Sequence, residues 1–306
     1  MMGESKFTPE EYLKYLEIDD LSRHILVEGR DDKRIFELLL RELCHTDEKS
    51  QILVDSAEAF VECHPENRET VEDICDKITG ETYSDRLVAF VDREFREFDF
   101  PQLLDRVNGH KVSGQLVWSR GHSIENYFFD FDILCEPLIA FSPNGFNEAL
   151  DIFKDVFDSM MRVACAISLA AKEIGRLKRV RVSINAQMLD IDGSEIELNF
   201  DAWKTNLMGR LSPDEVEELF TGFKSWYNKV LEADYKVVRW MCDGHIGFDF
   251  IWAVYDRCAR LSGQRGTLKA RPPIPFNVCA NSWVKRLLDN QCEYPAAVLD
   301  LLGIVV

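Results

Sequence analysis

The 306-residue sequence lacks several features that would assign it at once to a class of proteins. No apolar run approaches the length of a membrane-spanning helix. The first residues, MMGESKFTPEEY, lack the basic and then apolar pattern of an export signal. There is also no internal repeat and no low-complexity tract. We therefore expect a folded cytoplasmic protein with no membrane segment.

Paired cysteine motifs are also missing. The sequence contains nine cysteines, but none has CxxC or CxH spacing. This spacing supports neither a zinc site nor a disulfide framework. We expect reduced thiols, most of them small side chains within the hydrophobic core.

Positive charge is scarce, and the formal net charge is −18. An acidic surface repels phosphate backbones, so nucleic-acid chemistry would need a metal ion, a local basic patch or a partner subunit. Simple solubility explains the same charge. Two stretches are basic, and each is interpreted either as a track for a nucleic-acid backbone or as a solvated helix face and loop. Their candidate residues are Arg179 and Arg181 in GRLKRVRV, and Lys269 and Arg271 further on.

The first half of the chain alternates strand-like apolar runs with amphipathic stretches. Thr8 and Glu11 have the pattern of a capping box that opens a short helix. Such alternation predicts parallel strands with helices on both faces of the sheet. The expected strands are 24–28, 51–54, 86–91 and 115–118; the expected helices are one after the first strand, one at 69–78 and a weak one near Leu103.

The second half is predicted to be mainly helical. Residues 146–171 form one long apolar-periodic stretch, which indicates a helix or a pair of helices. Asp192-Gly193 signals a turn. Further helices are expected after Ser212 and at 238–258 and 281–288. We therefore predict an α/β catalytic domain over 1–135 and a mainly helical region over 136–306.

Acidic residues follow two of the predicted strands. Glu28 ends the first strand, and Asp92 and Glu94 follow the third. Asp32 lies one helical turn beyond Glu28. Ligands of open parallel sheets gather at the carboxyl ends of the strands, so neighbouring strands would bring these acids to one edge. Four hard oxygen ligands with room for water suit Mg²⁺ or Mn²⁺ and not zinc.

Each acid also has a structural interpretation. Glu28 also fits a solvated strand end. Asp31-Asp32 also fits a pair of acids that compensate the helix dipole. The run that contains Asp92 and Glu94 is typical of a solvated charged loop. The joint pattern of two core strands that each end in an acid favours the site.

Three segments resemble a known family. VEGRDD after the first strand and FVDRE after the third are similar to the two signatures of the Toprim fold, the catalytic module of topoisomerases, primases and OLD-type nucleases. SRGHSIENYFF, at 119–129, resembles the Ser-Ile-Glu-Asn-Tyr block of the DUF4435 branch. That branch includes nuclease subunits of PARIS anti-phage defence systems. The motifs cover the chain as far as about Cys135.

The resemblance implies a Toprim-like parallel sheet and metal-dependent phosphodiester hydrolysis. Its implied catalytic and metal-binding residues are Glu28, Asp32, Asp92 and Glu94, with Glu28 as general base or acid. It further implies a toxic effector that cleaves host RNA, with transfer RNA as the expected target. Such an effector is held by an ATPase subunit of the AriA type, and it self-associates, as a homodimer, after release.

Two positions depart from the family pattern. Glu94 stands where the family usually has aspartate, and His245 follows Gly244 where many members carry lysine. Glu125 is interpreted either as a further acid at the sheet edge or as part of a helix start capped by Ser123. His245 is likewise either a replacement for the lysine or a structural residue. The alternative functions are an OLD-type DNA nuclease and a catalytically weak Toprim scaffold or sensor.

Overall fold

The computed structural model describes residues 7–43, 52–62, 64, 66–141, 146–263, 274–289 and 291–304. Its chain divides into two compact units. The first unit comprises residues 1–93, 107–124 and 284–306. The second unit comprises 94–106 and 125–283.

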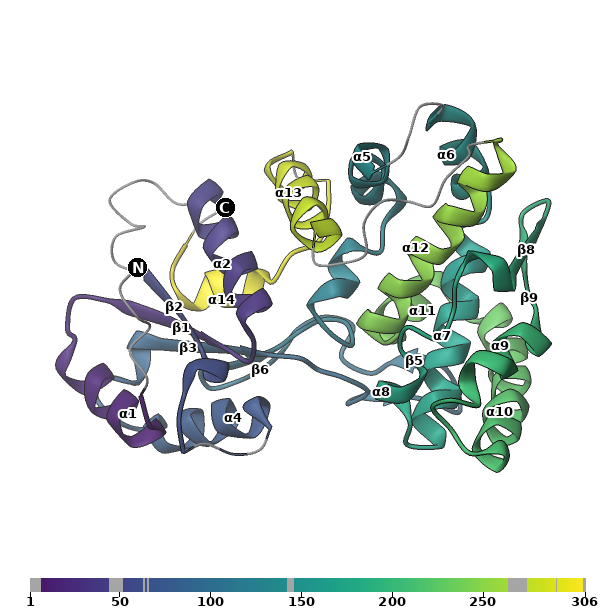
Figure 1. Cartoon of the computed structure of the whole chain (residues 1–306). Coiled ribbons are helices and arrows are strands. Elements are labelled where there is room, and N and C mark those ends of the chain that lie inside the picture. Colours follow the sequence, from purple (N-terminus) through teal and green to yellow (C-terminus); the bar gives the residue numbers. More distant parts are fainter. Residues whose placement is uncertain are drawn as a thin grey trace. The chain divides into compact units, whose positions relative to one another are not determined.

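A five-stranded sheet forms the centre of the first unit, with strand order β2-β1-β3-β7-β6 (Figure 1). The first four strands of this order run parallel, and β6 is antiparallel to β7. Their bounds are β1 Arg23–Val27, β2 Ile52–Ser56, β3 Leu87–Val91, β6 Lys111–Ser113 and β7 Leu116–Trp118. The predicted α/β class is therefore confirmed, and each of the four predicted strands is present.

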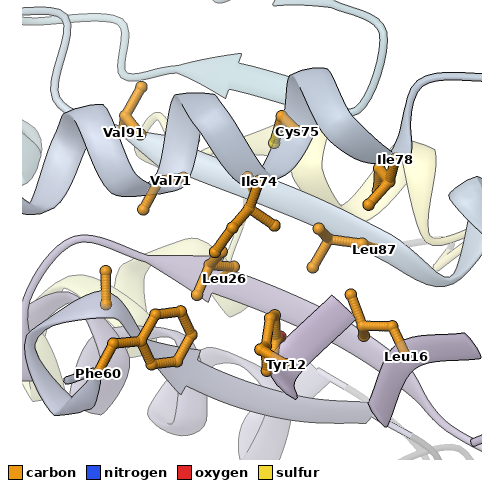
Figure 2. Close-up of a cluster of buried hydrophobic side chains, with 12 residues drawn as sticks. Tyr12, Leu16, Leu26, Phe60, Val71, Ile74, Cys75, Ile78, Leu87 and Val91 are labelled. Atoms are coloured by element: carbon orange, nitrogen blue, oxygen red, sulfur yellow. The ribbon is translucent and has the colours of Figure 1, made fainter. Parts of the chain in front are cut away.

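Helices α1 (Pro9–Ile18) and α4 (Asn67–Ile78) cover one face of this sheet. Figure 2 shows the core beneath them, where Tyr12 of α1 and Ile74 of α4 meet Leu26 of β1. Burial of these side chains removes apolar surface from water at roughly 25 cal/mol per Å². The other core members in this cluster are Leu16, Ala57, Phe60, Val71, Cys75, Ile78, Leu87, Ala89 and Val91.

The opposite face carries α2 (Arg30–Leu43) and α14 (Ala296–Leu301). Phe36 of α2 packs edge-on against Phe90 of β3, with ring centroids 5.1 Å apart. Every residue of β3 is buried, as expected for a parallel strand covered on both faces. The sheet therefore forms the middle of three layers.

The predicted capping box of α1 is present. Thr8 Oγ1 accepts the backbone N–H of Glu11, and the Glu11 carboxylate accepts the backbone N–H of Thr8. Two N–H groups that the first turn would leave without a helical partner are thereby satisfied. The first unit also contains two short 3₁₀ helices, η1 (Ala57–Ala59) and η2 (Ser84–Arg86).

The weak helix predicted near Leu103 is wrong. The structure instead has two short antiparallel strands, β4 (Phe98–Asp99) and β5 (Leu104–Asp105). Glu94, Glu97 and Leu103 all have positive φ angles, of 53°, 59° and 48°. Left-handed residues interrupt a right-handed helix, so this stretch turns repeatedly.

The second unit confirms the prediction of a mainly helical C-terminal region. Residues 146–171 form a pair of helices, α6 (Phe146–Asp155) and α7 (Phe157–Glu173). Thirteen of the seventeen residues of α7 are buried, which is typical of a helix at the centre of a bundle. The remaining helices are η3 Ile124–Phe128, α5 Phe131–Phe141, α8 Leu177–Val180, η4 Ala186–Met188, α9 Phe200–Leu207, α10 Pro213–Glu232, α11 Tyr235–Met241, α12 Gly244–Leu261 and α13 Ile274–Leu288.

The predicted helix over 238–258 is divided in two. Asp243 lies between α11 and α12, and its carboxylate accepts the backbone N–H of Ile246 at 2.8 Å. This N-cap starts a new helix, because capping requires a non-helical backbone at the cap residue. The predicted turn at Gly193 joins β8 (Leu189–Asp192) to β9 (Glu195–Leu198) in an antiparallel hairpin.

The contact-defined units differ from the predicted domain bounds of 1–135 and 136–306. Residues 94–106 group with the helical unit, and 284–306 return to the sheet unit, where α14 packs on β3. Within the described part of the chain, none of the helices combines the length and apolar character that crossing a membrane requires.

Most of the described cysteines are buried, as predicted. Burial raises the pKa of Cys165 to about 12, because a thiolate is poorly solvated in the core. Such thiols act as small apolar side chains.

Candidate functional site

Glu28 and Asp92 lie at the carboxyl ends of two neighbouring strands. β1 and β3 pair in parallel, with Val27 opposite Phe90. Each acid is the first residue after its strand, so both emerge at the same edge of the sheet. Glu28 Oε1 accepts the backbone N–H of Asp92 at 2.8 Å. The structure thus brings together the two positions that the sequence singled out first.

Further main-chain contacts hold Glu28 in place. Its carbonyl oxygen accepts the backbone N–H of Glu58 at 3.2 Å and the hydroxyl of Ser56 at 3.4 Å. Ser56 ends β2, so three adjacent strand ends meet at this residue. Glu28 is only partly buried; its main chain is held on the β2 side, and its carboxylate accepts the Asp92 N–H on the β3 side.

Asp32 closes the turn between β1 and α2. Its Oδ2 accepts the backbone N–H of Gly29 at 3.0 Å. A Cβ at Gly29 would lie 3.2 Å from that same oxygen, so glycine permits the close approach. Neighbouring Asp31 pairs with Arg34 at 2.8 Å on the surface. These contacts match the structural interpretation of Asp31-Asp32, and a role of Asp32 as metal ligand stays a prediction.

A buried arginine follows Asp92 directly, and sequence reasoning missed it. The Arg93 side chain is fully buried, and its Nη1 donates to the carbonyl of Arg120 at 2.9 Å. Its backbone N–H donates to Ser119 Oγ at 2.9 Å. Ser119 in turn donates to the carbonyl of Gly121 at 2.7 Å. The only sequence signal was the position of Ser119, which follows the fourth predicted strand as Glu28 follows the first.

His110 lies near two arginines, the buried Arg93 and the partly exposed Arg120. Burial, together with the charges of Arg120 and Arg93, lowers the pKa of His110 to about 4. A second proton on the imidazole would be both desolvated and repelled. His110 is therefore neutral near pH 7. Arg120 is itself ion-paired with Glu293.

Glu94 belongs to the second unit. It follows Asp92 by two positions along the chain, and its side chain is exposed. Among the residues that the structure describes, no group of three or more His, Cys, Asp or Glu side chains is gathered so as to hold a metal ion. The structure therefore unites Glu28 with the backbone of Asp92, and the joint role of the four acids stays a prediction.

Glu125 and His245, which the sequence nominated separately, contact each other in the second unit. Glu125 Oε1 lies 3.4 Å from His245 Nδ1. Glu125 belongs to η3 and is largely buried, whereas His245 is exposed in the first turn of α12. Glu125 therefore has a polar partner in its largely buried position.

The rest of the SIENY block has a structural role in the second unit. Asn126 Nδ2 donates to the carbonyls of Arg239 and Cys242, at 2.7 and 2.9 Å. Arg239 donates in return to the carbonyls of Asn126 and Tyr127. The Tyr127 ring packs against Trp240. Asn126 and Tyr127 therefore brace the junction between α11 and α12, and a helix cap by Ser123 stays a prediction.

The two candidate arginines of the basic stretch around α8 differ in their contacts. Arg181 pairs with the fully buried Asp243 at 2.8 Å, which favours a structural role. Arg179 is exposed, and its guanidinium donates to the carbonyl of Arg210 at 3.2 Å. A neutral carbonyl does not cancel its charge, so Arg179 remains a local positive centre. Lys269 and Arg271 lie outside the described residues.

The comparisons with known proteins add no relative. No family model matches the chain, and no curated protein shows significant similarity to it. The fold itself defines an α/β protein whose mainly parallel sheet carries an acidic pair at its carboxyl edge.

Proposed function

We propose that this chain is a Toprim-type nuclease that depends on Mg²⁺ or Mn²⁺ and acts as the toxic effector of an anti-phage defence system in the cytoplasm. The observation that carries the proposal is the contact between Glu28 and Asp92. Two acids follow adjacent parallel strands, and a hydrogen bond of 2.8 Å from the backbone of one to the carboxylate of the other joins them.

The donor set at this edge fits a small divalent cation. Mg²⁺ usually binds one or two protein carboxylates, and water and substrate phosphate oxygens complete its shell. Glu28 and Asp92 would hold the ion, with Asp32 and Glu94 as the further acids that the family pattern implies. When bound, such an ion supplies an activated water and offsets charge on the scissile phosphate.

Three residues at this edge have a role in the proposed phosphodiester hydrolysis. Glu28 is held rigidly by its main-chain contacts, which suits a general base or acid whose position decides the rate. Gly29 lets the backbone approach a phosphate closely. Buried Arg93 adds a positive charge directly after Asp92 and offsets part of the negative charge of the acids.

For the substrate, we propose host RNA, with transfer RNA as the target class that the family resemblance implies. A protein with a net charge of −18 needs a local positive surface to bind it. Arg179 and its neighbour Lys178 are exposed on α8 and supply such charge. We further propose an ATPase subunit as inhibitory partner and a homodimer as the active form.

Cleavage assays with the purified full chain test the proposal. Labelled transfer RNA, single-stranded DNA and duplex DNA are incubated with and without Mg²⁺, using wild type, Glu28→Ala and Glu28→Gln. The glutamine variant keeps an oxygen that accepts the Asp92 N–H, so it removes the charge and not the fold. We expect metal-dependent cleavage of RNA by wild type and a loss of at least about 100-fold in both variants.

The other outcomes separate the alternatives. Cleavage of duplex DNA in place of RNA would identify an OLD-type nuclease. Unchanged cleavage by the glutamine variant would disprove the assigned site. No cleavage of any substrate by folded protein without its partner would favour a scaffold or sensor. Expression with and without the ATPase, followed by sequencing of RNA ends, tests the cellular role.

A further inference from the structure

A cavity of about 630 Å³ lies in the second unit, between β9, the start of α9 and helix α10. The volume is within the range of small-molecule sites, roughly 300–1,000 Å³. Its lining includes an aromatic wall, two acidic side chains, aliphatic side chains and a single lysine. The aromatic wall consists of Phe200, Phe223 and Tyr227, and the acidic side chains are Glu195 and Glu197.

The three rings of the wall form one continuous surface. Phe200 meets Phe223 at an interplanar angle of 61°, with centroids 5.5 Å apart. Phe223 stacks on Tyr227 at 15° and 5.6 Å. The face of an aromatic ring carries negative potential, so a wall of rings attracts cations.

The structure already places one cation on this wall. Lys224 Nζ lies 5.7 Å from the centroid of Phe200, and Lys224 lines the same cavity. This distance is within the range of a cation–π interaction. Lys224 is exposed on α10, so its flexible side chain can leave the ring at little cost.

One of the two acidic side chains of the cavity, Glu195, is held in position by a hydrogen bond. Glu195 Oε2 accepts the hydroxyl of Ser159 at 3.1 Å, and the same hydroxyl accepts the backbone N–H of Ile196. Glu195 and Tyr227 both line the cavity, and burial together with the Glu195 carboxylate raises the pKa of Tyr227.

Glu197 lies directly opposite Asp190 in the register of the hairpin. Asp190 is ion-paired with Arg257 at 2.7 Å, whereas Glu197 is exposed and lines the cavity. A cation bound in the cavity would therefore lie beside the carboxylate of Glu197. The two glutamates also disfavour phosphate and carboxylate ligands.

We propose that this cavity binds an organic cation, namely an ammonium or guanidinium group on an aliphatic chain. The charged group contacts the rings and the two glutamates, and the chain lies along the apolar lining of Val163, Ile196 and Leu198. A free polyamine and a lysine or arginine side chain of a protein share this chemistry. The inference is independent of the proposed nuclease activity.

Calorimetric titration of the full chain tests it, with spermidine and N-acetyl-lysine-methylamide as probes and 1,6-hexanediol as the neutral control. Lys224→Met should tighten binding of both cations, because it removes a competing charge. Glu197→Gln should weaken it. We expect each substitution to change the affinity by roughly 2- to 30-fold, as for the gain or loss of one cation–π or charge contact. Preference for spermidine would indicate a free polyamine, and preference for the blocked lysine a protein side chain.

Two charge-matched controls lie on the same helix. Lys229→Met and Glu218→Gln change the net charge in the same way, but neither residue lines the cavity. Both should leave the affinity within about 2-fold of wild type. The four substituted side chains are exposed, so circular dichroism should show unchanged folding, and Glu195→Gln provides a second acidic variant.

Three results would overturn the inference. The first is no binding of either cation to wild type and Lys224→Met at millimolar concentration. The second is weaker binding after Lys224→Met. The third is equal affinities in Glu197→Gln, Glu195→Gln and wild type.

Discussion

The carboxylate of Glu28 accepts the backbone N–H of Asp92 at 2.8 Å, although 64 positions separate the two residues in the chain. The hydrogen bond links the carboxyl ends of β1 and β3. It also means that Glu28 has a structural role besides the chemical role proposed for it. Substitutions at this position must separate the two.

The first prediction concerns stability at Glu28. Glu28→Ala removes the acceptor of the Asp92 N–H and should lower the free energy of unfolding by about 1 kcal/mol. Glu28→Gln keeps an acceptor and should stay within ~0.5 kcal/mol of wild type. Urea unfolding followed by circular dichroism measures both. Equal losses in the two variants would show that the charge of Glu28, and not its hydrogen bond, stabilises the edge.

The second prediction is a pH dependence that originates at His110. Its pKa is about 4 in the folded protein, below its ordinary value near 6.5. Between these values the unfolded chain binds more protons, so stability rises with pH across this window. The contribution is complete above pH 6.5 and is lost as the pH falls towards 4. The difference between the folded and unfolded pKa of His110 corresponds to at most ~3 kcal/mol in the free energy of unfolding.

His110→Gln provides the comparison. The free energy of unfolding, measured at intervals between pH 4 and 7, should rise less steeply in the variant than in wild type. Parallel curves for the two proteins would mean that His110 gains its proton equally in both states.

The third prediction concerns Gly247 on α12. A Cβ there would lie 2.6 and 2.7 Å from two ring atoms of Phe129. Alanine is normally preferred over glycine within a helix, but overpacking of a core costs about 1–3 kcal/mol. Gly247→Ala should therefore reduce the stability of the second unit.

Gly209→Ala is the matched control, because the nearest atom to its added Cβ would be a backbone oxygen at 4.0 Å. Chemical denaturation of both variants checks the expected difference. If Gly247→Ala were as stable as the control, Phe129 would be free to move aside.

The fourth prediction concerns Asn126 in the SIENY block. The fully buried side chain donates to the carbonyls of Arg239 and Cys242. Asn126→Ala leaves these acceptors without the donor and should cost about 1–3 kcal/mol. Asn126→Asp should cost more, because it places a carboxylate oxygen against a carbonyl.

Thermal and urea unfolding of the two Asn126 variants tests this order, with Asn281→Ala at an exposed position as control. A ranking in which aspartate is tolerated better than alanine would contradict the hydrogen-bond assignment.

Local sequence patterns were sufficient for most elements of the sheet unit. Apolar runs identified β1 and β3, because strands buried on both faces have few polar residues. The capping box at Thr8 identified the start of α1, because its hydrogen bonds join residues three apart. The same patterns placed Glu28 and Asp92 at strand ends.

Local patterns were insufficient for two of the predicted helices. Positive φ angles at Glu94, Glu97 and Leu103 exclude the helix expected near Leu103, and the N-cap at Asp243 divides the helix expected over 238–258. The burial of Arg93 and its contact with Arg120 depend on tertiary packing, and the position of Ser119 was their only sequence signal.

The sequence by itself determined the α/β class, the helical character of the C-terminal region and the acids that follow β1 and β3, since these depend on the order and periodicity of neighbouring residues. Only the tertiary structure decided that β1 and β3 are adjacent, that Glu125 meets His245 and that Arg181 is committed to Asp243. Contacts of that kind join residues far apart in the chain, and their formation depends on how whole elements pack.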